Sequence, residues 1–182
     1  MRHIAPVLLT FALASPVAAD IMRHEAAGLR FTVPKAWVRV PAPSDVRAAQ
    51  YKIPHAGSDS EDGELILFFF GTGKGGGVQD NLDRWYGQFT QPDGKPSRDA
   101  AVLTVRTVNG LRVTAVDLSG SYTAMAGPMQ QKGESKSGYR MLGAIVEGGE
   151  GPWFFKATGP SVTMDAAKPD FDALLQSLES HH

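Results

Sequence analysis

The sequence of 182 residues contains no cysteine and only five histidines. The missing cysteines exclude a disulfide framework, thiolate chemistry and a lipid-attachment cysteine near the N-terminus. Because histidines are so few and no serine lies in a G-x-S-x-G turn, a hydrolytic triad is not expected. Long blocks of one charge are also missing, since 18 lysines and arginines balance 19 acidic residues for a formal net charge of −1. This balance argues against a nucleic-acid partner.

Long apolar runs are also scarce. The most prominent one spans residues 4–14 and follows Arg2 near the N-terminus. The small residues Val17-Ala18-Ala19 follow it, which is the pattern of a cleavable secretory signal peptide. The run is shorter than the roughly 20 apolar residues of a transmembrane helix. We therefore expect a signal peptide over 1–19 and a periplasmic or secreted single domain over 20–182.

Short apolar segments bounded by glycine, proline and aspartate dominate the rest of the chain and predict strands. Asn109-Gly110 predicts a tight hairpin, because both residues tolerate a positive φ. The expected strands are Leu29–Val33, Trp37–Val40, Ala48–Ile53, Leu65–Phe70, Val102–Val108, Leu111–Leu118, Tyr139–Glu147 and Trp153–Ala157.

Two segments show helical spacing of apolar residues, one over residues 78–89 and one around residues 171–178. We expect Pro169 to be the first residue of the second helix, where its missing N–H costs nothing. The run Leu65–Phe70 has no polar alternation, which indicates a strand that is covered on both faces. The predicted fold class is therefore α+β: an α/β/α sandwich whose central sheet is mostly antiparallel.

The glycines at 71, 73 and 76 match the G-x-G-x-x-G pattern of dinucleotide-binding loops. That fingerprint requires parallel strands, whereas hairpin-forming segments follow this loop. A P-loop is excluded because Lys74 is followed by Gly75, where serine or threonine would hold magnesium. We expect no nucleotide cofactor.

Four segments, taken in order, resemble exported bacterial PsbP-like proteins over nearly the whole mature chain. They are 31–37 (FTVPKAW), 69–77 (FFGTGKGGG), 81–89 (NLDRWYGQF) and 151–160 (GPWFFKATGP). PsbP is the extrinsic subunit of photosystem II, and a Ran-binding nuclear import factor shares its fold. The resemblance implies an α/β/α scaffold that binds proteins and carries no catalytic constellation.

From these observations the sequence predicts an exported, non-enzymatic binding or accessory domain with an unidentified envelope protein as its partner. The expected contact surface is the glycine loop with the exposed edge of the following helix, while Trp85 and Phe89 hold that helix down. Its residues are Gly73, Lys74, Gly75, Gly76, Arg84 and Gln88.

Two alternatives stay open. A small-ligand binder or enzyme would use the junction between loop and helix, and a concave pocket containing Lys156, Arg84 and Tyr139 would favour it. The expectation for Lys156 itself is an amine that extends to solvent from the end of a strand. A metal protein would bind calcium at the acidic segment 59–64 or copper through methionines and a histidine. The copper candidates are Met22, His24, Met125 and Met129.

Overall fold

The computed structural model describes residues 20–124 and 133–181. The signal-peptide prediction and the copper candidates Met125 and Met129 lie outside these residues. In chain order the elements are β1 (Ile21–Ala26), β2 (Leu29–Pro34), β3 (Val38–Val40), β4 (Arg47–Ile53), β5 (Gly63–Phe69), α1 (Val78–Tyr86), β6 (Phe89–Thr90), α2 (Ser97–Ala100), β7 (Val102–Val108), β8 (Leu111–Thr123), β9 (Ser135–Gly148), β10 (Gly151–Pro160), α3 (Ser161–Gln176) and β11 (Glu179–Ser180). Within the described part of the chain, no helix is long and apolar enough to cross a membrane.

The central sheet is antiparallel at every pairing of neighbouring strands. Its order is β3-β4-β5-β10-β9-β8, and β6 and β7 both pair with different parts of the long strand β8. The predicted hairpin at Asn109-Gly110 is confirmed, because both residues have a positive φ and Val108 pairs with Leu111 across the turn. A small second sheet has the order β1-β2-β11.

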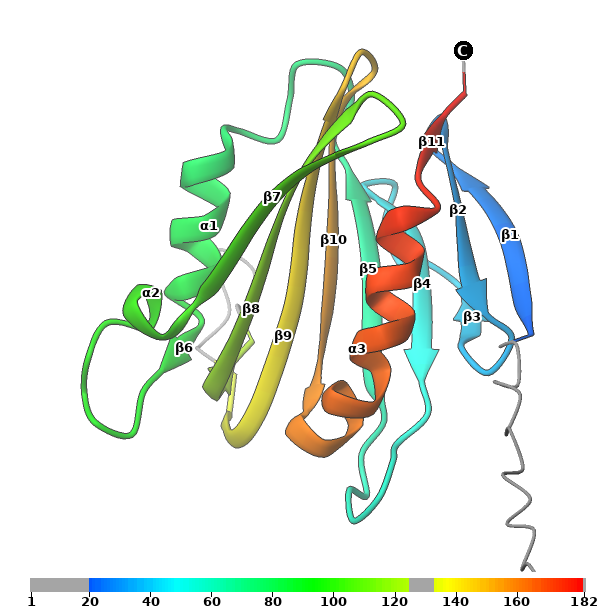
Figure 1. Cartoon of the computed structure of the whole chain (residues 1–182). Helices are drawn as coiled ribbons and strands as arrows, with labels where there is room; N and C mark the ends of the chain where they lie inside the picture. The colour runs from blue at the N-terminus through cyan, green and yellow to red at the C-terminus, as the bar shows by residue number, and fades with distance from the viewer. Residues whose placement is uncertain (1–19, 125–132, 182) are drawn as a thin grey trace, which may run out of the picture.

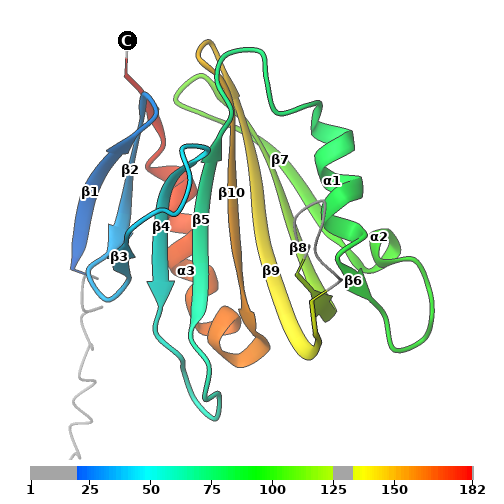
Figure 2. The same cartoon turned by 180° about the vertical axis from the view of Figure 1, so that it is seen from behind.

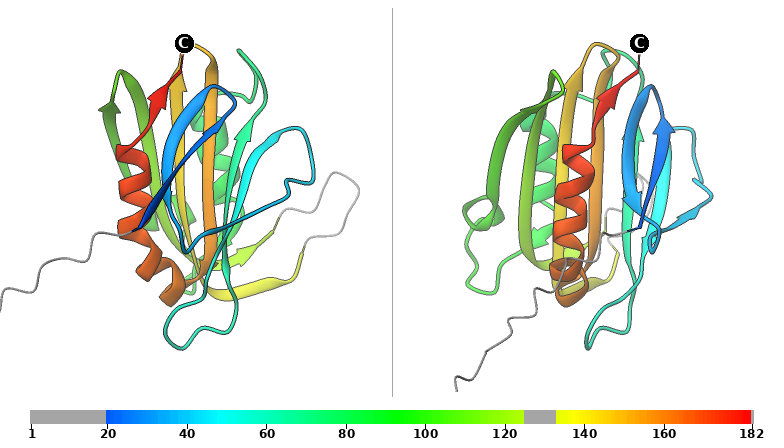
Figure 3. Two further views of the ribbon diagram at one scale, coloured as in Figure 1. Left: turned by 90° about the vertical axis from the view of Figure 1, so that its right-hand side faces the viewer. Right: turned by 45° about the vertical axis from the view of Figure 1, so that its right-hand side comes forward.

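Three layers result, as the sequence predicts (Figure 1). The helix α3 and the small sheet lie side by side on one face of the central sheet (Figure 3). The helix α1 lies on the other face, with α2 beside it (Figure 2). On this second face α1 covers the part of the sheet near β8 (Figure 2). The part formed by β4 and β5 is not covered on this face by a helix of the described residues.

Each face of the sheet has its own hydrophobic core. The core beneath α3 and the small sheet is the larger and includes Trp153, Phe155 and Phe171. The core beneath α1 includes Trp85 and Phe154. The middle of β5 is buried on both faces, which confirms the interpretation of its unbroken apolar run.

Both helices have other bounds than the sequence predicts. The first ends at Tyr86, because Phe89 leaves the helix and pairs with Tyr122 as part of β6. The second begins at Ser161, so Pro169 lies inside it rather than at its start. Its first turn receives a cap from a distant loop, since Asp59 accepts hydrogen bonds from the backbone N–H and the hydroxyl of Thr163. A cap from another part of the chain leaves no signal in the local sequence.

Candidate functional site

The candidate site begins with the alternation of side chains along two neighbouring strands. Successive residues of a strand point to opposite faces, so alternate residues of β10 face α3 and α1. Lys156 lies on the α1 face between two residues, Phe155 and Ala157, that enter the other core. On the α1 face the cross-strand pairs of β10 and β5 are Phe154 with Phe68, Lys156 with Ile66, and Thr158 with Glu64.

These pairs form the floor of a pocket of about 360 Å³. Its lining residues come from β4, β5, β8, β10 and α1, so the pocket lies on the face of the sheet that α1 covers in part. Side chains from α1 and its C-terminal end line one wall, namely Asn81, Arg84, Trp85 and Gln88. The remaining lining residues are Arg47, Phe70, Tyr122 and Ala124.

Lys156 is the most deeply buried charged residue of the pocket, with 8% of its surface exposed. Its Nζ donates hydrogen bonds to Gln88 Oε1 and to the Tyr122 hydroxyl, the latter at 3.1 Å. Burial lowers the pKa of this amine to about 8, while the Glu64 carboxylate raises it and Arg47 lowers it. The prediction that the amine extends to solvent is wrong, because the strand places Lys156 under α1 rather than at an open end of the sheet.

Two arginines reach the same pocket. Arg47 Nη1 donates a hydrogen bond to Gln50 Oε1 at 3.1 Å, and its guanidinium lies 5.7 Å from the centre of the Phe68 ring. Arg84 Nη1 donates to Asn81 Oδ1 at 2.9 Å. The pocket carboxylate, Glu64, accepts a hydrogen bond from the Gln50 amide at 2.9 Å.

The pocket therefore carries three cationic side chains and one carboxylate. Among the ion pairs of residues 20–124 and 133–181, none within 4.0 Å involves Arg47, Arg84 or Lys156. An excess of positive charge that is partly withdrawn from water favours an anionic occupant.

The glycine loop leads from β5 to α1, and Gly75 lies beside two residues of the pocket, Phe70 and Phe154. Gly75 has φ +99°, and a Cβ there would lie 2.7 Å from the ring of Phe154. The Asn81 amide donates hydrogen bonds to the carbonyls of Gly75 and Gly77, which fixes the loop to the first turn of α1. Gly73 has φ +69° and open space where its Cβ would be. The strand before the loop, β5, pairs antiparallel with both of its neighbours, so the parallel context of a dinucleotide site is missing here.

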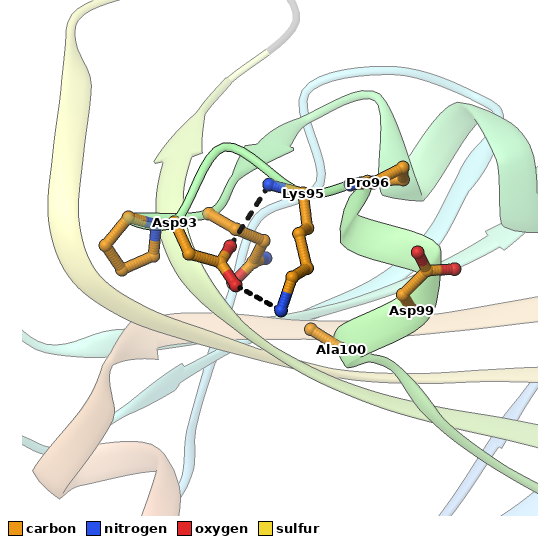
Figure 4. Close-up of a pocket in the computed structure, with 7 residues that line it drawn as sticks. Asp93, Lys95, Pro96, Asp99 and Ala100 are labelled. Atoms are coloured by element: carbon orange, nitrogen blue, oxygen red, sulfur yellow. Dashed lines mark hydrogen bonds and ion pairs between the residues drawn. The ribbon is translucent and has the colours of Figure 1, made fainter.

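A second hollow, of about 650 Å³, lies over residues 91–100 (Figure 4). Its walls are the turn before α2 and α2 itself, and most of its lining residues are exposed. Two of its ionic groups pair with each other, since Lys95 Nζ lies 3.2 Å from Asp93 Oδ2 and the Lys95 backbone N–H donates to Asp93 Oδ1. The hollow contains no buried charge, because the side chains of Asp93, Lys95 and Asp99 are all exposed.

The structure brings only part of the predicted surface together. Arg84 lines the pocket as an exposed residue of α1, and Lys74 lies in the glycine loop. Gln88 is not on an exposed helix edge; it follows α1, is 8% exposed and accepts a hydrogen bond from Lys156. Tyr139 does not line the pocket but stacks on Tyr122, with 5.9 Å between the ring centres.

Among the lining residues that sequence reasoning missed are Arg47, Glu64 and Tyr122. The signal for Glu64 was present, since Glu64, Ile66 and Phe68 alternate along one face of β5. The positions of Arg47 and Tyr122 depend on pairings between distant strands, which no local pattern reveals.

The acidic segment 59–64 does not assemble as a metal site. Asp59 caps α3, Glu61 pairs with Lys136, and Asp62 pairs with His55. Each carboxylate thus has its own partner. In the part of the chain that the structure describes, no three His, Cys, Asp or Glu side chains gather closely enough to hold a metal ion. The geometry gives no support to the calcium alternative.

Comparison of the sequence with protein-family models and with curated proteins finds no match. Solved structures do match. Cyanobacterial PsbP (CyanoP) from Synechocystis sp. PCC 6803 superposes with a TM-score of 0.53 at 15% sequence identity, covering 93% of this chain and 98% of CyanoP. The protein of unknown function PA94 from Pseudomonas aeruginosa superposes with a TM-score of 0.50 at 12% identity, covering 90% of this chain and 99% of PA94. The fold expected from the sequence motifs is confirmed: this chain has the PsbP-like fold.

Proposed function

We propose that this protein is an exported binding domain, an accessory protein without turnover, and that its binding site is the pocket between α1 and the central sheet. The proposal concerns the site rather than the fold, because one fold supports many functions. Of the glycine-loop residues Gly73, Lys74, Gly75 and Gly76, none lines this pocket directly, and Gly75 lies beside two of its residues, Phe70 and Phe154.

One observation carries the proposal: three cations share the pocket and none has an ion-pair partner within the described residues. Withdrawing a cation from water costs free energy that a nearby anion offsets. For Lys156 the burial is nearly complete, and its hydrogen-bond partners Gln88 and Tyr122 are neutral groups. An anionic group that enters the pocket would offset this free-energy cost, so these cations favour the binding of an anion.

A second feature is the place of Arg84 at the outer edge of the pocket. Arg84 is an exposed residue of α1 that lines the pocket, and its guanidinium is hydrogen-bonded to Asn81, which also holds the glycine loop. An arriving anion would therefore meet Arg84 at the rim and Lys156 at the floor.

Thermal unfolding in envelope extract tests the proposal. The purified domain is mixed with the macromolecular or the small-molecule fraction of an extract from the source organism, and its melting temperature is compared with that of Arg84→Ala. The matched control is Arg112→Ala, which removes an exposed arginine that pairs with Glu147 outside the pocket. We expect one fraction to stabilise the wild type and the control but not Arg84→Ala. Equal stabilisation of all three proteins, or of none, would contradict the proposal.

A further inference from the structure

Resting on the proposed function, we propose that the occupant of the pocket is a small molecule with a single carboxylate on a flat apolar body. The carboxylate lies against Lys156 and Arg84, and the body lies against the aromatic side chains of the pocket. Three observations fix this class: the balance of charges, the composition of the walls, and the place of the pocket relative to the start of α1.

The charges of the pocket favour an anionic group in the occupant. Arg47, Arg84 and Lys156 attract an anion, whereas the Glu64 carboxylate faces the same space and repels it. A single carboxylate gains from three cations against one like charge, and it accepts several hydrogen bonds with its two oxygens.

The walls indicate the rest of the molecule. Phe68, Phe70, Phe154 and Trp85 line the pocket together with the ring of Tyr122. Aromatic rings pack best against flat apolar groups, in stacked or edge-on arrangements. The volume of about 360 Å³ is near the lower end of the range for ligand pockets, which favours a small acid over a large one.

The start of α1 argues against a phosphate. Phosphate sites commonly use the free N–H groups at the start of a helix. Here the first turn of α1 and the loop line a different hollow, which contains Thr72, Gly76, Gly77 and Val78. The pocket with the cations contacts α1 only from Asn81 onward. Its cations therefore act without the helix N-terminus.

Titration calorimetry with four probes tests the inference: cinnamate, the uncharged cinnamyl alcohol, acetate and inorganic phosphate. We expect saturable binding of cinnamate, with each of the other probes weaker by roughly tenfold or more, because cinnamyl alcohol lacks the charge, and acetate and phosphate lack the ring. Arg84→Ala and Lys156→Met should weaken cinnamate binding by a similar factor, whereas Arg112→Ala should leave it unchanged. Arg84 is exposed, so its variant remains informative if Lys156→Met does not fold.

The variant Glu64→Gln separates this inference from others. Removing the like charge should strengthen cinnamate binding, whereas it would weaken the binding of a cation. Weaker cinnamate binding by Glu64→Gln, or binding of cinnamyl alcohol or phosphate as tight as that of cinnamate, would overturn the inference. If no probe binds while envelope extract still stabilises the wild type but not Arg84→Ala, the ligand class is wrong and the proposed function stands. If both experiments fail, both proposals fall.

Discussion

The burial of Lys156 predicts an unusual dependence of stability on pH. In the unfolded chain the pKa of this lysine is near its ordinary value of 10.5, and in the folded protein burial lowers it to about 8. Between these two values the unfolded state binds more protons than the folded state, so the free energy of unfolding rises with pH. The difference between the two pKa values corresponds to roughly 3 kcal/mol. This increment is missing below pH 8 and is complete above pH 10.5.

The variant Lys156→Met removes the titrating amine and keeps an unbranched side chain of similar length. Urea unfolding followed by tryptophan fluorescence gives the free energy of unfolding for both proteins at several pH values. The free energy of unfolding of the wild type, relative to that of the variant, should rise by roughly 3 kcal/mol between about pH 7 and pH 11. Subtracting the two curves removes the titration of groups that both proteins share. A difference that stays constant with pH would refute the burial of a charged Lys156.

The exposed Lys136 provides the control. Its ion pair with Glu61 raises its pKa, the opposite of the shift at Lys156. Stability from such a group is present below the ordinary lysine pKa and is lost as the pH rises through the raised value. The free energy of unfolding of the wild type, relative to that of Lys136→Met, should therefore not rise in the same pH range.

The remaining predictions concern packing, the glycine loop, nucleotides and export. Trp85→Ala should lower the free energy of unfolding by about 3–5 kcal/mol because it empties the core beneath α1, whereas Arg84→Ala should leave the melting temperature nearly unchanged. Gly75→Ala should destabilise more than Gly73→Ala, since both have a positive φ but only at Gly75 does the new Cβ meet an aromatic ring; equal losses in urea unfolding would contradict this. Calorimetry should detect no binding of NAD, FAD or ATP, and saturable micromolar binding would revive the dinucleotide interpretation. N-terminal sequencing of the exported protein should begin at Asp20, and a soluble product that keeps Met1 would contradict the signal peptide.

The sequence predicted the layers of the fold because its strongest signals are local. The apolar run of β5 and the Asn109-Gly110 turn depend on a few neighbouring residues. The start of α3 was missed for the opposite reason, since its first turn is capped by Asp59 from a distant loop. The short strand β11 was missed as well, because two residues carry no period.

The candidate site was predicted in part. Lys156 and Arg84 were named as possible pocket residues, and both line the pocket. The sequence could not show that α1 stops before Gln88, which turns this side chain from a surface residue into the hydrogen-bond acceptor of Lys156. Nor could it bring Arg47 to the same pocket, because that contact depends on the pairing of β4 with β5.

The most direct test of the account measures protons taken up when cinnamate binds at about pH 9. The groups that face Lys156 from the surrounding elements are Arg47, Glu64, Arg84 and Tyr122. In the protein without ligand, the amine of Lys156 is mostly neutral at this pH, since its pKa is about 8. A carboxylate beside the amine would raise that pKa. Calorimetry in two buffers of different ionisation enthalpy should show that the wild type takes up a large fraction of one proton, and that Lys156→Met takes up none. Binding of cinnamate with no proton uptake, or with equal uptake by both proteins, would show that the carboxylate does not lie beside Lys156.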